Sequence, residues 1–322
     1  MSSVKPLVKS LVPASVRRQL RALALLMGVE EHPPVPFDNT YAWLNHTFLE
    51  LLQNSRCSDK PMYLWGVLQA AALAKVLKIP RISVLELGVA GGFGLLSLEA
   101  IAAVVKNRTG VEIDVLGFDT GVGLPKPEDV RDQPNMWFEG QLPMDREALE
   151  SKLETAKLVI GPVKDTMSTF IRENPAPVGF VSFDLDLYTS TRDAMILFEV
   201  GRDRLLPRVP CYFDDIFGHT YNEYCGERLA INEFNDQHDE TKICPMHGLR
   251  YFLPRVLFLD IWPDCMYYAH CFDHPRYSEL DSLNKAVITD VDGFDVRVPP
   301  ASAWNRKQRT SPAKVRQSET LP

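Results

Sequence analysis

The stretch VLELGVAGGFGLLSLEAIA, residues 84–102, passes from an apolar strand through a glycine-rich turn into a helix. The strand ends near Glu86, and the helix begins at about Phe93. Four glycines lie in or just after the turn: Gly88, Gly91, Gly92 and Gly94. Glycine allows a sharp bend and close approach of a ligand, and the helix start offers free amide groups. The spacing departs from the GxGxxG fingerprint, so the turn alone is only weak evidence for a nucleotide-like ligand.

Short apolar strands and helical stretches alternate after this turn. Four further strand candidates follow it, at residues 111–119, 157–163, 178–186 and 207–217. Such alternation predicts an α/β fold with a doubly wound, mostly parallel sheet, whose loops carry the chemistry at the carboxyl ends of the strands. Helical spacing in residues 40–55 and 62–79 predicts a helical extension before the sheet, and the last strands are expected within residues 249–300, with 255–262 and 265–272 as candidates.

The composition excludes several classes of protein. A chain of 322 residues with 45% hydrophobic content can bury a large α/β core. The net charge of -7 argues against a general nucleic-acid binder. Six cysteines without a CxxC pair predict reduced thiols in a cytoplasmic protein, and no apolar run reaches the roughly 18 residues of a membrane span. The oligomeric state is left open, a homodimer included.

Acidic residues end three of the predicted strands. Asp119 ends the second strand beside the glycine turn, where a carboxylate can accept both hydroxyls of a ribose; the alternative is a loop aspartate that caps TGVGLP. Asp184 and Asp186 end the fourth strand, and Asp214 and Asp215 end the fifth. Four converging carboxylates cannot all ionise unless a cation neutralises them, and Mg²⁺ with its preference for oxygen ligands is the default.

These motifs, in this order, resemble a known family. Glu-x-Gly-x-x-Gly-Gly, GFDTGVGLP, GPVKDTM, DLDLYTST and YFDDIFG look like the class I S-adenosylmethionine-dependent methyltransferases, and specifically the macrocin O-methyltransferase family, over residues 80–220. The resemblance implies a seven-stranded Rossmann-like sheet and a sugar or glycan-like small molecule as acceptor. It also implies a set of cofactor-binding residues: Glu86, Gly88, Gly91, Gly92, Asp119, Asp165 and Thr166.

The resemblance further divides the four aspartates by role. Asp184, Asp214 and Asp215 would bind the metal, and Asp186 would be the general base. Aspartate is a weak base, with a reference pKa of about 3.9. A metal that binds the acceptor hydroxyl lowers the pKa of that hydroxyl, so a modest base suffices.

The expected domain organisation combines the same resemblance with the composition along the chain. Residues 1–36 form a basic helical arm with a proline-rich linker, and the arm packs on the body or lies on a membrane surface or a partner. Residues 37–300 form the methyltransferase domain, and 301–322 a disordered tail. The domain has three expected parts: a helical cap at 37–80, the cofactor and metal core at 81–220, and the substrate side with the last strands at 221–300.

Several alternatives remain open at this stage. Asp184 and Asp186 could pair with Arg192 or Lys164 while the second acid pair only caps the next segment. The DxD pattern also occurs in metal-dependent glycosyltransferases, a nicotinamide-dependent oxidoreductase is weakened by the missing GxGxxG, and a non-catalytic protein could keep the fold.

Histidines and aromatic residues give weaker signals. His219 and His247 are candidates for contact with the substrate, or are hydrogen-bonded structural histidines. Zinc is conceivable at two places, Cys244 with His247 and His270 with His274. Trp137 and Phe138 belong to a lid or are packing anchors.

Overall fold

Seven strands in the described part of the chain form one sheet in the order β3-β2-β1-β4-β5-β7-β6. The structure is a computed structural model and describes residues 40–53, 55–173, 175–218, 220–253, 257 and 260–280. The first five strands are parallel, whereas β7 is antiparallel to both of its neighbours. This is the sheet of the class I methyltransferase fold, so the predicted fold class is confirmed.

The strands have the following bounds: β1 Arg81–Leu87, β2 Glu112–Asp119, β3 Lys157–Ile160, β4 Val178–Phe183, β5 Arg208–Phe213, β6 Thr241–Pro245 and β7 Met266–Cys271. The central strand β4 is buried at every position, because helices cover both faces of the sheet. The longer helices are α3 Thr40–Leu51, α5 Pro61–Val76, α6 Phe93–Thr109, α8 Val163–Arg172, α9 Tyr188–Ala194 and α10 Gly226–Gln237.

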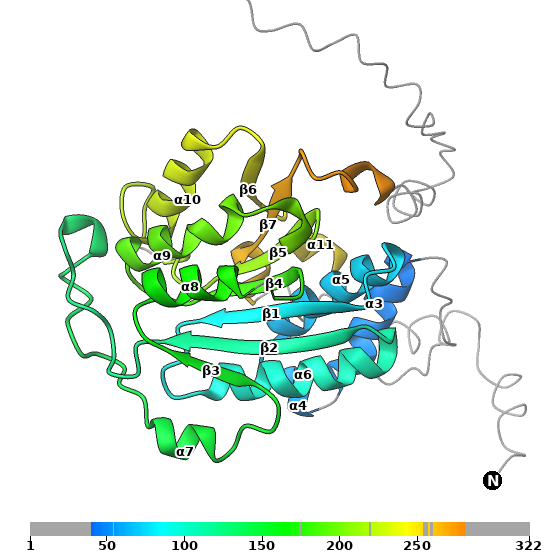
Figure 1. The fold of residues 1–322 in the computed structure, drawn as a ribbon, viewed down its shortest axis with the longest axis horizontal. Coiled ribbons are helices and arrows are strands. Elements are labelled where there is room, and N and C mark those ends of the chain that lie inside the picture. The colour runs from blue at the N-terminus through cyan, green and yellow to red at the C-terminus, as the bar shows by residue number, and fades with distance from the viewer. Residues whose placement is uncertain are drawn as a thin grey trace, which may run out of the picture.

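Two helical layers enclose the sheet. One contains α3, α5 and α6 together with the short α4 Ser55–Ser58, and the other contains α8, α9 and α10 (Figure 1). The carboxyl ends of β1 and β2 point to the same edge of the sheet, beside the long segment that leads to α7 Arg146–Glu150 (Figure 1). That edge is where ligands of doubly wound sheets bind.

Most predicted elements are present, and two predictions of strands were wrong or incomplete. The five predicted core strands and both upstream helices form, and residues 265–272 contain β7. β6 was missed: it is a five-residue edge strand with a lysine and a proline and too short a pattern to recognise. The described residues of 255–262 contain no strand, and Trp262 instead begins the 3₁₀ helix η5 Trp262–Cys265.

Three further predictions concern the two ends of the chain, the cysteines and membrane spans. The basic arm and linker at 1–36 and the tail at 301–322 lie outside the described residues. All six cysteines are free. Within the described ranges, no helix combines the length and the apolar character needed to cross a bilayer. The remaining short helices are α11 Leu249–Phe252, η1 Val130–Asp132, η2 Met195–Glu199, η3 Arg202–Arg204 and η6 Tyr277–Leu280.

Candidate functional site

A cavity of about 480 Å³ opens at the carboxyl ends of β1, β2 and β4. The glycine turn, residues 88–94, lines it from β1, and residues 184–186 line it from β4. The loop after β2 and the start of α8 complete the wall. The volume lies within the roughly 300–1,000 Å³ of small-molecule sites.

Glycine is needed in the turn for close approach of other parts of the chain. Gly88 has φ +86°, and a Cβ there would lie 1.8 Å from the backbone oxygen of Asp184. Gly92 has φ +83°, and its Cβ would collide with the side chain of Leu149. A Cβ on Gly91 would meet no atom within 4 Å, although Gly91 lines the cavity. The turn is therefore shaped by contacts with β4 and α7 as well as by its own sequence.

Asp119 holds the glycine turn in place through backbone amides. Its Oδ2 accepts hydrogen bonds from the N–H groups of Val89, at 2.9 Å, and Ala90, at 3.0 Å. Its Oδ1 accepts one from the N–H of Gly121, at 2.6 Å, which matches the capping alternative. A carboxylate offers about four acceptor positions, so about one is left for a ligand. The ribose role of Asp119 stays a prediction, and the structure adds an organising role.

Of the two cofactor-binding residues predicted at 165–166, one lines the cavity. Asp165, in the first turn of α8, is part of the wall. Thr166 is not; its hydroxyl donates to the carbonyl of Pro162, at 3.0 Å, and its methyl group lies under Gly161. The prediction is therefore stronger for Asp165 than for Thr166.

Glu86 lines the cavity and is almost fully buried, with 2% of its surface exposed. Its Oε1 accepts a hydrogen bond from the hydroxyl of Tyr63, at 2.7 Å, whereas its Oε2 is buried without a partner. A Cβ on Gly94 would lie 1.8 Å from Oε1, so a larger residue there would displace the Glu86 carboxyl. Burial raises the pKa of Glu86 to about 8, and the Tyr63 hydrogen bond and the charge of Lys60 oppose the rise. The carboxyl is thus placed to gain from a cationic ligand.

Asp184 and Asp214 follow directly on neighbouring strands. Phe183 of β4 pairs with Phe213 of β5, and the N–H of Asp214 donates to the carbonyl of Phe183, at 3.0 Å. The N–H of Asp184 donates to the carbonyl of Leu87, at 2.9 Å. The sheet therefore brings the two acid pairs to one edge, as the sequence predicted.

Asp186 has a strained backbone. Its φ is +61°, in the left-handed region that favours glycine, and the N–H of Leu187 donates to the carbonyl of Leu185 at 2.5 Å. An i to i+2 hydrogen bond around a residue with positive φ is a rare and strained γ-turn. Strain of this kind, of the order of 1–3 kcal/mol, clusters at functional sites. The turn presents Asp186 to the cavity, which it lines together with Asp184.

The acid cluster is electrostatically crowded. Burial and repulsion from Asp215 and Asp184 raise the pKa of Asp186, and burial and repulsion from Asp214 and Asp215 raise that of Asp184. Burial also raises the pKa of Asp215, although the hydroxyl of Tyr221 donates to it at 2.8 Å. Such mutual repulsion is relieved by protons or by a cation.

The described residues do not assemble a metal centre. No three His, Cys, Asp or Glu side chains among them converge closely enough to hold an ion. Asp214 accepts from the hydroxyl of Tyr212, at 2.6 Å, and neither Asp214 nor Asp215 lines the cavity. The oxygen donors suit Mg²⁺ chemically, but their arrangement does not form its coordination set. The magnesium site therefore stays a prediction.

The ion-pair alternative for the first acid pair finds no support. Arg192 forms its ion pair with Asp193, at 2.7 Å. The cation that acts on Asp184 is Lys60, which precedes α5 and lines the cavity. Lys60 and Tyr63 were missed by sequence reasoning, because they lie more than 100 residues before the acid pairs and no local motif marks them.

The described histidine and aromatic candidates lie away from this cavity. His219 is outside the described residues. His247 is exposed and, with Cys244, lines a separate cavity of about 550 Å³ between α10 and β6. His270 contacts the hydroxyl of Tyr277 at 2.8 Å. Neither of the two zinc candidates, Cys244 with His247 and His270 with His274, belongs to a group of the described residues that could hold a metal ion. The lid residues Trp137 and Phe138 lie in the loop after β2 but do not line the cavity: Trp137 is half-buried and Phe138 is 62% exposed.

The solved structures similar to this chain include two of the methyltransferase CalS11 and one of Rv0187. CalS11, described as a calicheamicin methyltransferase, is 20% identical over 75% of this chain and 97% of its own, with a TM-score of 0.45. The apo structure of CalS11, described as TDP-rhamnose 3'-O-methyltransferase, is 20% identical over 80% of this chain and 95% of its own, with a TM-score of 0.39. Cofactor-bound Rv0187 from MTB is 14% identical over 84% of this chain and 96% of its own, with a TM-score of 0.35.

The likeness to these structures extends to the fold alone. No protein-family model matches the chain, and no curated protein sequence matches it. The reaction and the acceptor therefore have to be argued from the residues of the site.

Proposed function

We propose that this protein is an S-adenosylmethionine-dependent O-methyltransferase that methylates a hydroxyl of a sugar or glycan-like small molecule, with Asp186 as general base. One observation carries the proposal: the glycine turn and the strained turn at Asp186 line the same cavity. A cofactor held by the first would lie beside a proton acceptor held by the second. The sugar acceptor rests on the resemblance of the motifs.

The cavity suits the cofactor in size and charge. S-adenosylmethionine carries a sulfonium and an ammonium group, and it supplies the activated methyl group of the reaction. Glu86 offers an unpartnered, buried Oε2 at the cavity wall, which a cationic group would satisfy. Gly91 lines the cavity without a side chain and lets the backbone approach the ligand closely, and Asp165 supplies a carboxylate to the wall.

Asp186 is suited to receive the proton that the acceptor hydroxyl must lose. As the oxygen–carbon bond forms and the sulfur–carbon bond breaks, the hydroxyl proton passes to the Asp186 carboxylate. The γ-turn fixes the direction of this side chain, and positioning of the reacting groups supplies much of the rate.

A magnesium requirement is a separate part of the proposal. Asp184, Asp214 and Asp215 carry the oxygen ligands that Mg²⁺ prefers, and they would hold the ion only after their side chains move closer together. Bound there, the ion would supply the positive charge that the crowded carboxylates lack. The assignment of the cofactor cavity does not depend on the ion. The base role of Asp186 does gain from it, because burial and repulsion raise the pKa of Asp186 to about 9 and a cation would lower that pKa.

Binding measurements separate this function from its rivals. Calorimetry with S-adenosylhomocysteine, UDP and NAD, each with and without Mg²⁺, is expected to give binding of S-adenosylhomocysteine alone. Tight binding of UDP without S-adenosylhomocysteine would favour a glycosyltransferase, and binding of NAD alone an oxidoreductase. A screen of sugar and small-alcohol acceptors with labelled methyl donor then identifies the acceptor.

A single substitution tests the base. Asp186→Asn is expected to abolish methyl transfer and to leave the affinity for S-adenosylhomocysteine nearly unchanged. Asp203→Asn is a matched control, because Asp203 lies on η3 with 80% of its side chain exposed and should give full activity. Normal turnover in Asp186→Asn would remove the base assignment.

A further inference from the structure

We propose that Asp132, in the loop after β2, is a positioning residue that holds the Asp186 turn in its active geometry. The inference rests on the proposed function, because it assigns to Asp132 a part in the same reaction. Asp132 lies 54 residues before Asp186 and belongs to none of the motifs that resemble the family.

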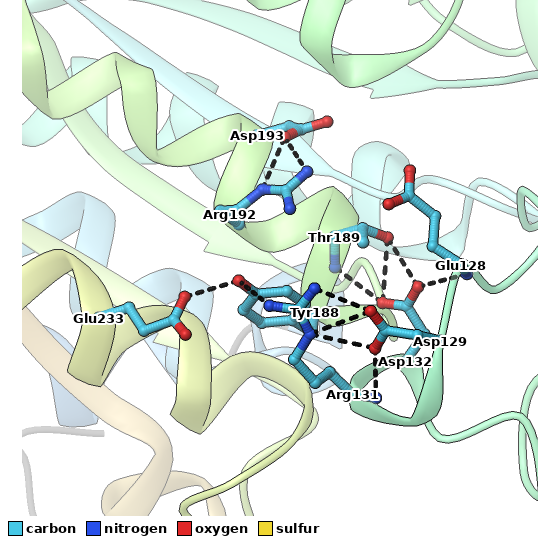
Figure 2. A network of polar contacts seen from close by, with 9 residues as sticks. All are labelled: Glu128, Asp129, Arg131, Asp132, Tyr188, Thr189, Arg192, Asp193 and Glu233. Carbon is cyan, nitrogen blue, oxygen red and sulfur yellow. Dashed lines mark hydrogen bonds and ion pairs between the residues drawn. The ribbon is translucent and has the colours of Figure 1, made fainter.

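Asp132 is fully buried and joins the loop to the start of α9. Its Oδ1 accepts from the backbone N–H of Thr189 at 2.8 Å and from the Thr189 hydroxyl at 3.0 Å (Figure 2). Its Oδ2 accepts from the N–H of Glu128 at 2.8 Å and also lies 3.0 Å from the Thr189 hydroxyl. A buried carboxylate with this many donors is fixed in one orientation.

The anchored residue comes immediately after the strained turn. Thr189 is three residues beyond Asp186 and is the second residue of α9. A backbone with positive φ at a non-glycine residue persists only where its surroundings hold it. The free N–H groups at the start of α9 need acceptors, and Asp132 supplies one from another part of the chain.

Tyr188 provides a second tie between the same segments. Its hydroxyl donates to Glu233 of α10 at 2.6 Å and accepts from the guanidinium of Arg131 at 3.1 Å (Figure 2). The guanidinium carbon of Arg131 also lies 4.5 Å from the centre of the Tyr188 ring. Loop, α9 and α10 are thus connected around the two residues that follow the turn.

Asp132 acts on the cavity through its neighbours. Glu128 and Thr189 both line the cavity, on the loop wall and on the α9 wall, whereas Asp132 does not. The next residue, Gln133, donates from Nε2 to the carbonyl of Thr220 at 3.4 Å, beyond the second acid pair. The loop therefore ties the cofactor side of the cavity to the segment that carries the base.

The experiment compares four variants in the full-length protein. Asp132→Asn and Thr189→Val each remove part of the contact, and Thr189→Ser keeps the hydroxyl. Asp145→Asn is the matched control: Asp145 is an exposed carboxylate near the end of the same loop that accepts from the N–H of Ala148 at 3.0 Å. Three quantities are measured: amide hydrogen exchange, affinity for S-adenosylhomocysteine, and kcat and KM for the acceptor that the screen identifies.

The positioning role has a distinct expected signature. In Asp132→Asn and Thr189→Val, amides of residues 185–191 should exchange about tenfold faster, while those of α5 stay protected. The kcat should fall about 10- to 100-fold, because a displacement of about 1 Å can cost that much, with cofactor affinity changed less than about threefold. Thr189→Ser and Asp145→Asn should behave like the unmodified protein.

Other outcomes overturn the inference. Unchanged exchange at 185–191, unchanged kcat despite faster exchange, or a Thr189→Ser variant as impaired as Thr189→Val would each do so. If Asp132→Asn does not fold, the two Thr189 variants decide the question. If the unmodified protein transfers no methyl group, the proposed function fails, and the exchange data alone then show whether Asp132 holds the turn.

Discussion

Replacing Glu86 by glutamine is expected to change how the stability of the protein depends on pH. The carboxyl has a pKa of about 8 in the folded protein, against 4.5 for the free side chain, because burial disfavours its charged form. The pKa of Glu86 is higher in the folded protein than in the unfolded chain, so its protonated carboxyl favours the folded state. This contribution to the free energy of unfolding is fully present below the unfolded pKa and is lost as pH rises through about 8. Glutamine has a similar shape and does not titrate.

The size of the effect follows from the two pKa values. Each pKa unit corresponds to about 1.4 kcal/mol, and the unfolded carboxyl is already mostly ionised at about pH 5. Between about pH 5 and about pH 8, the free energy of unfolding of the unmodified protein should fall by about 3 kcal/mol relative to Glu86→Gln. Urea unfolding of both proteins without cofactor, at several pH values in that range, measures the difference.

Glu99→Gln is a control, because the pKa of Glu99 is shifted in the opposite direction from that of Glu86. Burial raises the pKa of Glu99, but hydrogen bonds from the N–H groups of Thr155, Ala156 and Glu154 outweigh it, so the net pKa is lowered. Its stabilising contribution is present above the unfolded pKa and is lost only as pH falls through the folded value, so the cost of Glu99→Gln should be constant from about pH 5 to about pH 8. A pH-independent difference for Glu86→Gln would refute the reasoning about its burial.

Three further outcomes are expected. Gly88→Ala, whose Cβ would meet the Asp184 carbonyl at 1.8 Å, should lower the free energy of unfolding by at least about 3 kcal/mol and abolish cofactor binding. Gly110→Ala, with φ +74° and open space around its Cβ, should lower the free energy of unfolding by only about 1 kcal/mol in urea unfolding. Equal losses in the two variants would contradict the close approach of Gly88 to Asp184. Tyr63→Phe removes the donor to Glu86 and should cost about 1–3 kcal/mol, which thermal and urea unfolding would check; an unchanged stability would count against that hydrogen bond. EDTA should stop methyl transfer and added Mg²⁺ restore it in a radiolabel assay; full activity in EDTA would remove the metal from the proposal.

Much of the architecture is readable from the sequence because it depends on local patterns. Apolar runs bounded by turn residues predicted β1 to β5, and helical spacing predicted α3 and α5. The glycine turn and the acids at strand ends could be placed at one edge because parallel strands share it. β6 was not predicted, because a five-residue edge strand is too short to show a recognisable hydrophobic pattern.

The site depended on contacts that no local pattern encodes. The amino-acid order put Asp119 beside the glycine turn, but only the packing of the turn against β2 gave its carboxylate the amide donors of Val89 and Ala90. The environment of Glu86 is set by Tyr63, which precedes it by 23 residues on another element. A desolvated carboxyl takes its pKa from such neighbours, whatever its sequence context.

The sequence alone determined the order of the chemistry-bearing residues and the edge of the sheet where they meet, since these follow from hydrophobic periodicity and strand direction. The tertiary structure decided which acids reach the cavity: Asp184 and Asp186 line it, while Asp214 and Asp215 do not. It also decided the strained backbone at Asp186 and its tie through Asp132. Those features arise where segments distant in sequence compete for the same space and the same hydrogen bonds, which only the folded chain brings together.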